Sequence, residues 1–510
     1  MGIRFVGIIG LFLSLLFLGA CGQVEIQEAV TAQPSDRPET TETVEALPTD
    51  AATSTPILIV TITPTPVISD VRLTHDLLWL RSGDEDEIED YYGEIWRWRA
   101  NTLSAEKLVG SSDDSLVVVP GPILDFDEQN GVILVSLIAG IDAQEEATYQ
   151  LGIVDIEKLN YRVLVESKQN LRFPRSPFEE IALSPDANWA AYSFGLITDY
   201  DLTSQYPFYS YRDREINIFQ IDQPWDVISL GRCDFLTNRG SCFVGLHWAP
   251  DSSKLAWHGN GGLWIHEIEG SPELFIEDFI DLENETKNIR YSPREWSLDG
   301  KYLIYSREGW EWGEKGILEV ETGKFVEIPQ TRIAVGHPHT EVVLSSPERV
   351  YVVQSVFQDP RAEEPPKHTD VTIYEIYSST DGISLVEYAH RELKSNLQDY
   401  AYDPVILPDG DILWIIERIQ AEDDSYLPNQ RFLVANYELF RNEIIELNQF
   451  DFSMDKLEHV YRRFYWISGG SGILIHHHGY AVYVATDGSV SASITEIVGN
   501  DACCFAWVEN

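Results

Sequence analysis

The sequence predicts an all-β protein in which four-stranded sheets repeat around a single closed ring. Three observations indicate this class: a turn motif that recurs along the chain, about four strand-like segments for every ~40–60 residues, and aromatic residues concentrated in one region. All 14 Trp residues lie beyond residue 70. Residues 71–510 can therefore build a large core, whereas the first 70 residues differ in kind.

A nine-residue frame occurs three times, at 184–192, 249–257 and 297–305, each time between two apolar segments. In the first copy, Ser184-Pro185-Asp186, proline presets φ and aspartate bonds its own backbone, as in a tight turn. Residues that pack well on a pleated surface fill the flanks. Each copy therefore predicts the first hairpin of a four-stranded sheet. Weaker copies stand at 127–131, 345–348, 407–411 and 468–472.

Counting strands around these hairpins gives seven sheets, at 122–166, 178–231, 243–276, 291–328, 340–388, 402–447 and 463–497. Strand-like segments at 76–80, 94–98 and 107–109 precede them but lack an innermost strand. The C-terminal segment supplies one, because Trp507 stands where Trp248 and Trp296 stand in their copies. A C-terminal strand that completes the first sheet removes two open edges. Eight units are therefore favoured, with seven as the alternative.

The Ser-Pro-Asp frame followed by alanine and an aromatic residue resembles the repeat of TolB-like and WD-repeat-like β-propellers. The resemblance covers about residues 71–510 and implies a single closed β-propeller whose sheets are blades. The Trp-Asp dipeptide occurs once, at Trp225-Asp226, outside the expected register. That departure argues against a true WD-repeat protein.

The N-terminus predicts export. An apolar run over 5–17 is too short to span a bilayer as a resident helix and fits a signal peptide over residues 1–20. Its end, Leu18-Gly19-Ala20-Cys21, resembles the bacterial lipobox, which implies lipid attachment at Cys21 and a place on the extracytoplasmic side of a bacterial membrane. An ordinary secretory signal with a coincidental cysteine is the alternative.

Residues 21–70 predict a disordered tether. Thr, Pro, Glu and Ala dominate the segment and no aromatic residue occurs in it. Such a composition cannot bury enough apolar surface to offset its ordering entropy. The folded part is then held off the membrane by this tether.

The formal net charge of −47 repels nucleic acid and favours solubility and cationic partners, unless the acidic surface is merely solvated. The acidic run 84–90 departs from EF-hand spacing, and the histidines at 476–478 fall on a different blade from His337 and His339. No metal and no cofactor are predicted.

The remaining cysteines fall into two pairs. Cys233 and Cys242 are close in one inter-blade loop, and export permits their oxidation, so a disulfide is predicted. Cys503 and Cys504 are adjacent in a predicted strand and are expected to be buried free thiols, because a vicinal disulfide would strain it.

Long loops between second and third strands predict one elaborated binding face. The loop at 194–214 holds Tyr206, Tyr209 and Tyr211, and the loop at 307–315 holds Trp310 and Trp312. Tyr and Trp are favoured at interfaces and on sugar platforms. Packing of loop on loop is the alternative reading of these aromatics.

The sequence favours binding over catalysis. A propeller-capped hydrolase would need a nucleophile elbow, and Gly469-Gly470-Ser471-Gly472-Ile473 lacks its last glycine. No catalytic residue is therefore assigned. The predicted function is protein or peptide binding, or scaffolding, in the cell envelope. The alternatives are carbohydrate binding and a propeller-based lyase or glycosidase that uses carboxylates.

Overall fold

The computed structural model describes residues 73–82, 93–102, 104–109, 117–118, 124–127, 131–141, 146–158, 160–170, 176–201, 208–233, 244–281, 284, 287–309, 312–331, 333–334, 340–346, 349–356, 368–380, 382–393, 398–406, 412–419, 430–438, 443–452, 463–467, 470–477, 480–485, 491–499 and 502–508. The predicted signal peptide and tether lie outside these residues. Among the described residues, no helix has the length and apolar character needed to cross a membrane.

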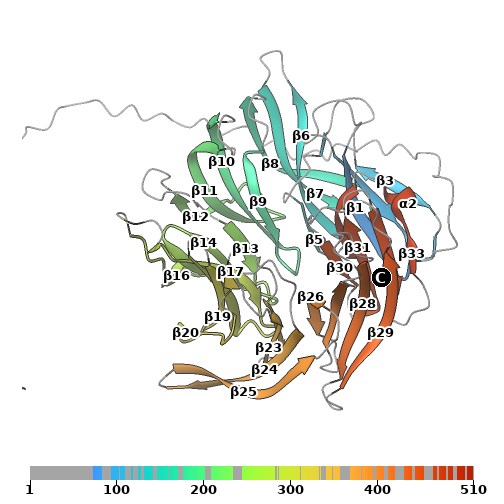
Figure 1. The fold of residues 1–510 in the computed structure, drawn as a ribbon. Helices are drawn as coiled ribbons and strands as arrows, with labels where there is room; N and C mark the ends of the chain where they lie inside the picture. Colours follow the sequence, from blue (N-terminus) through green and yellow to red (C-terminus); the bar gives the residue numbers. More distant parts are fainter. Residues whose placement is uncertain are drawn as a thin grey trace, which may run out of the picture. The chain divides into compact units, whose positions relative to one another are not determined.

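The described chain is all-β, as predicted, and its antiparallel strands follow one another along the sequence (Figure 1). The first sheet has nine strands and contains two four-stranded units, joined through β4. Its strands are β1 (Asp76–Ser82), β2 (Gly93–Trp98), β3 (Ala105–Val109), β4 (Val117–Val118), β5 (Leu124–Asp127), β6 (Val132–Ile141), β7 (Glu146–Asp155), β8 (Asn160–Asn170) and the C-terminal β34 (Ala502–Val508).

Three further sheets follow in the first half of the chain. The first consists of β9 (Phe178–Leu183), β10 (Trp189–Asp201), β11 (Phe208–Gln220) and β12 (Ile228–Cys233). The next consists of β13 (Val244–Trp248), β14 (Lys254–Gly259), β15 (Gly262–Glu267) and β16 (Glu273–Glu277). The third has β17 (Arg290–Trp296), β18 (Tyr302–Glu308), β19 (Trp312–Glu319), β20 (Lys324–Glu327) and the short added strand β21 (Ile333–Ala334).

Three more sheets complete the described fold. They consist of β22 (Thr340–Ser346), β23 (Arg349–Val356), β24 (His368–Ser379) and β25 (Gly382–Leu393); of β26 (Gln398–Ile406), β27 (Ile412–Ile419), β28 (Gln430–Glu438) and β29 (Glu443–Phe452); and of β30 (Arg463–Trp466), β31 (Gly472–His477), β32 (Tyr480–Ala485) and β33 (Ser491–Ser493). A single turn of helix, α2 (Thr495–Val498), precedes β34. The seven sheets and their order support the β-propeller class, while eight blades and ring closure stay predictions.

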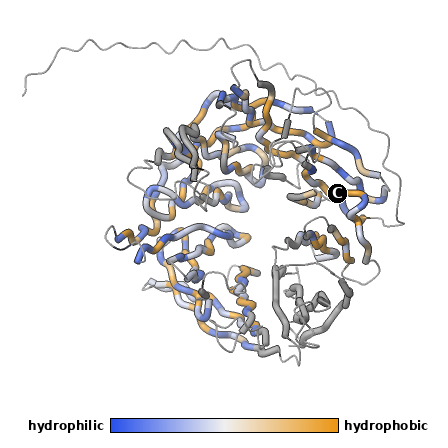
Figure 2. Tube along the Cα trace, turned by 45° about the horizontal axis from the view of Figure 1, so that its top comes forward, coloured by the Kyte–Doolittle hydropathy of each residue, from blue (hydrophilic) through white to orange (hydrophobic). Residues whose placement is uncertain are grey.

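The sheets stack because both of their faces are apolar. Hydrophobic residues recur along the strands (Figure 2), and in the middle strand β18 the successive residues Tyr302, Leu303, Ile304 and Tyr305 are all buried. Because the strand period is two residues, apolar side chains then reach both faces of the sheet. In sheet β17–β21, Leu303 and Tyr305 pack in one cluster with Leu263 of the preceding sheet. Ile304 and Val342 pack on the other side, in a cluster shared with the following sheet. Each sheet therefore gains its core from two neighbours, as blades do.

The three strong copies of the turn frame have one backbone conformation. Residues Ala187, Ser252 and Gly300 are equivalent and have positive φ values of 52°, 61° and 67°. In the first copy, the N–H of Ala187 donates to the Ser184 carbonyl at 2.8 Å. The Ser184 hydroxyl donates to Asp186 at 2.6 Å, and this bond fixes the turn before β10 begins. The predicted hairpins are therefore confirmed in these copies.

The C-terminal strand joins the N-terminal one. β34 pairs antiparallel with β1, with Trp507 opposite Leu77 and Val508 opposite Asp76. This pairing places the C-terminal segment at the edge where the sequence predicted an innermost strand. Trp507 and Phe505 lie in a buried cluster that also contains residues of β31 and β32.

Three tryptophans link neighbouring sheets through their indole N–H groups. Each stands at or next to the end of an edge strand, and its indole donates to a carbonyl on an edge strand of another sheet. The bonds run from Trp248 to the Ala182 carbonyl at 3.2 Å, from Trp296 to the His247 carbonyl at 3.0 Å, and from Trp507 to the Tyr465 carbonyl at 2.9 Å. The equivalence inferred from the sequence thus extends to one repeated contact between sheets.

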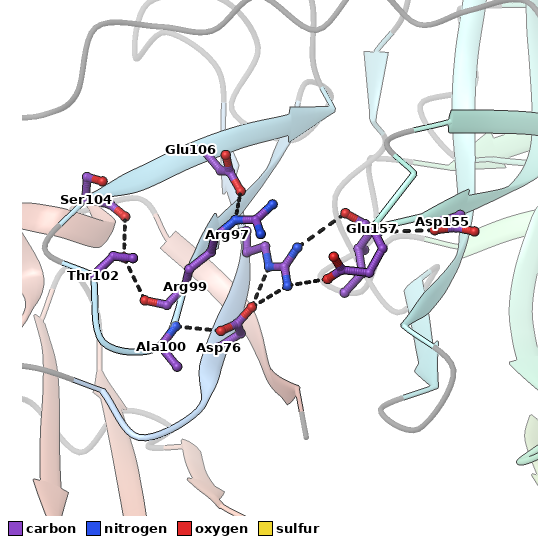
Figure 3. Close-up of polar contacts among 10 residues, drawn as sticks. Asp76, Arg97, Arg99, Ala100, Thr102, Ser104, Glu106, Asp155 and Glu157 are labelled. Atoms are coloured by element: carbon purple, nitrogen blue, oxygen red, sulfur yellow. Dashed lines mark hydrogen bonds and ion pairs between the residues drawn. The ribbon is translucent and has the colours of Figure 1, made fainter. Parts of the chain in front are cut away.

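A buried arginine connects the two units of the first sheet (Figure 3). Arg97 on β2 is 4% exposed, and its Nε donates to Asp76 at 2.6 Å. Its Nη2 donates to Glu157 at 2.6 Å, in the turn that follows β7. Asp76 also accepts the N–H of Ala100. A buried charge without a partner is costly, so Arg97 favours the arrangement in which both carboxylates reach it. The network therefore ties the first residue of β1 to the turn after β7.

The prediction of long loops is wrong at two places. The segment 194–214 is mostly a continuation of the β10–β11 hairpin, in which Ile197 is opposite Tyr211 and Tyr200 is opposite Tyr209. β-branched and aromatic residues favour strands, and here they extend the ladder beyond the sheet core. The segment 307–315 is a short connection, because β18 ends at Glu308 and β19 begins at Trp312.

Candidate functional site

The structure describes only some of the aromatic residues predicted to bind a partner. Tyr206 and Trp310 lie outside the described residues. Tyr209 and Tyr211 stand on β11, where only the backbone is described. Trp312, the first residue of β19, is described in full and is half-buried. The candidate site is therefore built around Trp312.

Trp312 lies against a guanidinium group. The Cζ atom of Arg307, on the adjacent strand β18, lies 5.2 Å from the centre of the indole ring. A cation over an aromatic face is attracted by the ring quadrupole, by about 0.5–2 kcal/mol depending on desolvation. Gly309 completes the turn, because its N–H donates to the Trp312 carbonyl at 2.9 Å. A Cβ at Gly309 would lie 2.3 Å from indole atoms, so only glycine lets the ring lie there.

Arg307 is held by two carboxylates. It forms ion pairs with Glu314 on β19, which is buried, and with Glu327 on β20 at 2.7 Å. Desolvation acts against the charge on Arg307, but the hydrogen bond and charge of Glu314 outweigh it and raise the pKa of the guanidinium further. Arg307 is thus a permanently charged group, fixed between Trp312 and the outer strand β20. We call Arg307, Trp312, Glu314 and Glu327 the Arg307 cluster.

A layer of aromatic rings lies beside the Arg307 cluster. Tyr305 is fully buried, and its ring centre lies 5.8 Å from Tyr291 and 6.1 Å from Phe325. The hydroxyl of Tyr305 is buried and forms no hydrogen bond. Phe325 is exposed, at 47%. An exposed aromatic next to a fixed guanidinium is the composition typical of binding hot spots.

A second set of polar residues comes from β17, β19 and β22. Lys315 donates to Glu341 on β22 at 3.3 Å. The side chain of Glu295, on β17, is exposed to solvent, although protein atoms surround its carboxyl closely. This desolvation raises the pKa of Glu295 to about 7; Lys315 opposes the shift and the charge of Glu341 adds to it. Glu295 can therefore exchange a proton near neutral pH, beside the charged groups of Lys315 and Glu341.

A histidine on the neighbouring sheet, His247, has a lowered pKa. Burial lowers the pKa of His247 to about 4, and the charge of Arg294 contributes to the shift. Arg294 is itself bound to the Ser306 hydroxyl at 2.6 Å and to Glu308 at 2.7 Å. His247 is therefore neutral at pH 7.

The described part of the chain holds no cluster of three or more His, Cys, Asp or Glu side chains arranged to hold a metal ion. His476 stands on β31 as predicted, and its ring packs 5.0 Å from that of Phe505. Cys21 and Cys242 lie outside the described residues, and Cys233 ends β12. Cys503 and Cys504 belong to β34, with their side chains outside the description, so the cysteine predictions stay predictions.

Sequence reasoning missed Arg307, Glu314 and Glu327. Arg307 and Glu314 face each other across the β18–β19 hairpin, so correct strand ends would have paired them. Because the segment 307–315 was predicted to be a loop, its residues were not assigned to paired strands.

Comparison with known proteins finds only distant structural likenesses. No family model and no curated protein matches the chain. Solved structures that resemble it include prolyl oligopeptidase B from Galerina marginata, at 10% identity and a TM-score of 0.38, covering 74% of this chain and 50% of that one. A functionally unknown protein from Desulfotomaculum acetoxidans is 10% identical with a TM-score of 0.35, covering 76% and 98%. Dipeptidyl peptidase 4 from Porphyromonas gingivalis is 8% identical with a TM-score of 0.36, covering 73% and 59%.

The chain spans about half of the length of the prolyl oligopeptidase it resembles. Since function lives in sites and not in folds, these likenesses say nothing about activity.

Proposed function

We propose that this chain is a lipid-anchored β-propeller of the bacterial cell envelope that binds a protein or peptide on the extracytoplasmic side. The TolB-like turn frame and the lipobox-like end at Cys21 support this place and architecture. Binding is preferred to catalysis because the charged side chains of the site built around Arg307 and Trp312 pair with one another, and no hydroxyl or thiol nucleophile is among them.

The observation that carries the proposal is the Arg307 cluster. Trp and Arg are enriched among residues that dominate binding energy, and rigid groups lose little entropy when a partner docks. Arg307 is fixed by Glu314 and Glu327, and Trp312 is fixed by Arg307 and by the Gly309 turn. The cluster is thus preorganised before any partner arrives.

A protein or peptide partner is preferred to a sugar because of Trp312. Sugar recognition uses an open aromatic face, and the guanidinium of Arg307 lies over one face of this indole. A ligand that meets the edge of the ring and the adjacent carboxylates fits the arrangement better. Peptide groups and basic side chains provide such contacts.

The test compares Trp312→Ala with Trp225→Ala in the mature protein. Trp225 is 73% exposed and lies in the turn before β12, so its variant is a matched control for loss of a surface indole. Partners captured from envelope extract, and a glycan array, are measured with both variants. Loss of a true hot spot costs over ~2 kcal/mol, or about thirtyfold in affinity.

Equal binding by the two variants would refute the Arg307 cluster as the binding site. Selective loss of a glycan, with no loss of a protein partner, would instead support the carbohydrate alternative.

The anchor is tested separately. Metabolic labelling with a fatty-acid analogue should mark the wild-type chain and leave Cys21→Ala unlabelled. Equal labelling of both would end the lipoprotein proposal without affecting the binding site.

A further inference from the structure

The outermost strand of sheet β22–β25 is among the long ones. β25 has 12 residues, β8 and β29 have 11 and 10, and β12, β16, β20 and β33 have 6, 5, 4 and 3. In the described part of the chain β25 pairs with β24 alone, so its other edge bears backbone groups that no described strand uses. A long edge strand is a template for pairing with another chain.

β25 has only some of the features that commonly protect an edge: a register shift with β24 leaves Tyr388 as an extra residue and the strand carries Glu387, but it has no lysine and no proline. Proteins blunt edges with lysine, proline or short strands, and the sequence of β25, GISLVEYAHREL, contains neither residue. The long outer strand β8 does contain a lysine, Lys168. Val386 and Tyr388 are instead 51% and 54% exposed along β25.

These exposed residues belong to one connected patch. Arg349 lies with its Cζ 4.4 Å from the centre of the Tyr388 ring and is paired with Glu375 at 3.3 Å. Tyr377, which is 50% exposed, donates its hydroxyl to Glu375 at 2.7 Å. Glu375 is opposite Val386 in the ladder, so the two side chains share a face of the sheet. We call Arg349, Glu375, Tyr377, Val386 and Tyr388 the Tyr388 patch.

The Tyr388 patch has the composition of an interface. Two tyrosines and one arginine are the residue types enriched at hot spots, and the hydrogen bonds among them fix their positions. Its apolar residue, Val386, stands on the strand whose edge is open. Side-chain contacts and backbone pairing are thus available to the same partner, as in strand addition.

Charge selects the partner. The chain carries 83 acidic residues against 36 basic ones, and β25 carries Glu387 and Glu392 against Arg391. The only guanidinium in the Tyr388 patch is already paired with Glu375. A second copy of this chain would bring the same negative charge, whereas a basic segment would be attracted.

We propose that the edge of β25 docks an extended, basic segment of another protein, which adds to sheet β22–β25 as a fifth hydrogen-bonded strand over the Tyr388 patch. This surface is separate from the Arg307 cluster and does not depend on the function proposed for it.

The probe is a fluorescent dodecapeptide of alternating lysine and valine, and the comparator alternates glutamate and valine. Anisotropy with the mature chain should show tighter binding of the basic peptide. The double variant Val386→Lys, Tyr388→Lys should weaken it by at least about tenfold. Leu298→Lys, at a residue 76% exposed in the turn before β18, adds a lysine elsewhere and should leave binding unchanged.

Hydrogen exchange supplies a readout of the pairing itself. Binding of the basic peptide should slow amide exchange in residues 382–393, and Trp312→Ala should not alter this protection. If the double variant does not fold, Ser384→Lys places a lysine at another exposed position of β25 and serves in its place.

Three results would overturn the proposal. They are equal binding of the acidic and basic peptides, an equal loss with Leu298→Lys, and unprotected amides in β25. A dimer in sedimentation that the double variant dissociates would assign the edge to a second copy, which also contradicts a basic partner.

Discussion

Replacing Trp296 with phenylalanine isolates one contact between two sheets. Trp296 is 6% exposed, and its indole N–H donates to the His247 carbonyl at 3.0 Å. Phenylalanine keeps an aromatic ring in the site but removes the donor, so the partly buried carbonyl of His247 loses this hydrogen bond. The expected cost is about 1–3 kcal/mol in the free energy of unfolding. Alanine would also leave a cavity and cost about 3–5 kcal/mol.

The assay is urea unfolding of the mature protein followed by circular dichroism, which does not depend on tryptophan emission. Trp225→Phe is the control, because Trp225 is 73% exposed and exposed substitutions usually stay within about 0.5 kcal/mol. Trp248→Phe and Trp507→Phe should each lower stability as Trp296→Phe does, because each removes the same bond. The reasoning fails if Trp296→Phe unfolds like Trp225→Phe. Stability unchanged in Trp507→Phe alone would refute the link between β34 and β30.

Three further predictions concern stability. Asp76→Asn should cost about 3–5 kcal/mol, because it leaves the buried Arg97 short of a counter-charge; urea unfolding measures the loss, and a cost below that of an exposed pair would contradict it. Ala187→Gly should gain about 1 kcal/mol, since Ala187 has a φ of 52°, and Gly300→Ala should lose a similar amount at a φ of 67°, because the new Cβ would make only an ordinary contact with Ala249 at 3.9 Å; opposite signs in thermal melts would refute the shared turn geometry. The pKa of Glu295 is raised to about 7, so its contribution to stability is present at low pH and is lost as pH rises through 7; Glu295→Gln should reduce the pH dependence of the free energy of unfolding between pH 5 and 8, and an unchanged pH profile would exclude Glu295 as the group responsible.

The sheets could be predicted because their signals are local. The Ser184 frame sets a turn by short-range hydrogen bonds, and the structure contains those bonds at 2.6–2.9 Å. Alternation along the strands fixes which residues are buried, and the predicted spans agree with the sheets from Leu124 to Ser493. The pairing of β34 with β1 followed from an incomplete first unit and from the position of Trp507.

The extended β10–β11 hairpin could not be separated from a loop by the same reasoning. Its residues 194–201 mix β-branched and acidic side chains, a composition compatible with either state. Their pairing with 208–215 depends on the register set further down the hairpin. Local composition carries no information on how far such a ladder continues.

The polar networks were missed for a different reason. Arg97 is joined to Glu157 across 60 residues of sequence, and no local pattern marks either residue as a partner. Arg307 and Trp312 are closer in sequence, but their contact requires the tight turn at Gly309 that the sequence reading replaced with a long loop. Contacts such as that between Arg97 and Glu157 depend on how the units are placed next to each other. A short segment of sequence does not predict that placement.

The charge balance connects these networks to binding. Arg97 and Arg307 each form ion pairs with two carboxylates, one of them buried, and Arg349 is held by Glu375. Because only 36 basic residues face 83 acidic ones, most acidic groups outside these networks have no basic residue left to pair with. A field of this sign steers basic partners and weakens as salt screens it, with a Debye length of about 8 Å at physiological ionic strength. Both proposed surfaces should therefore release a basic partner as salt rises, whereas a partner held by apolar contact alone would stay bound.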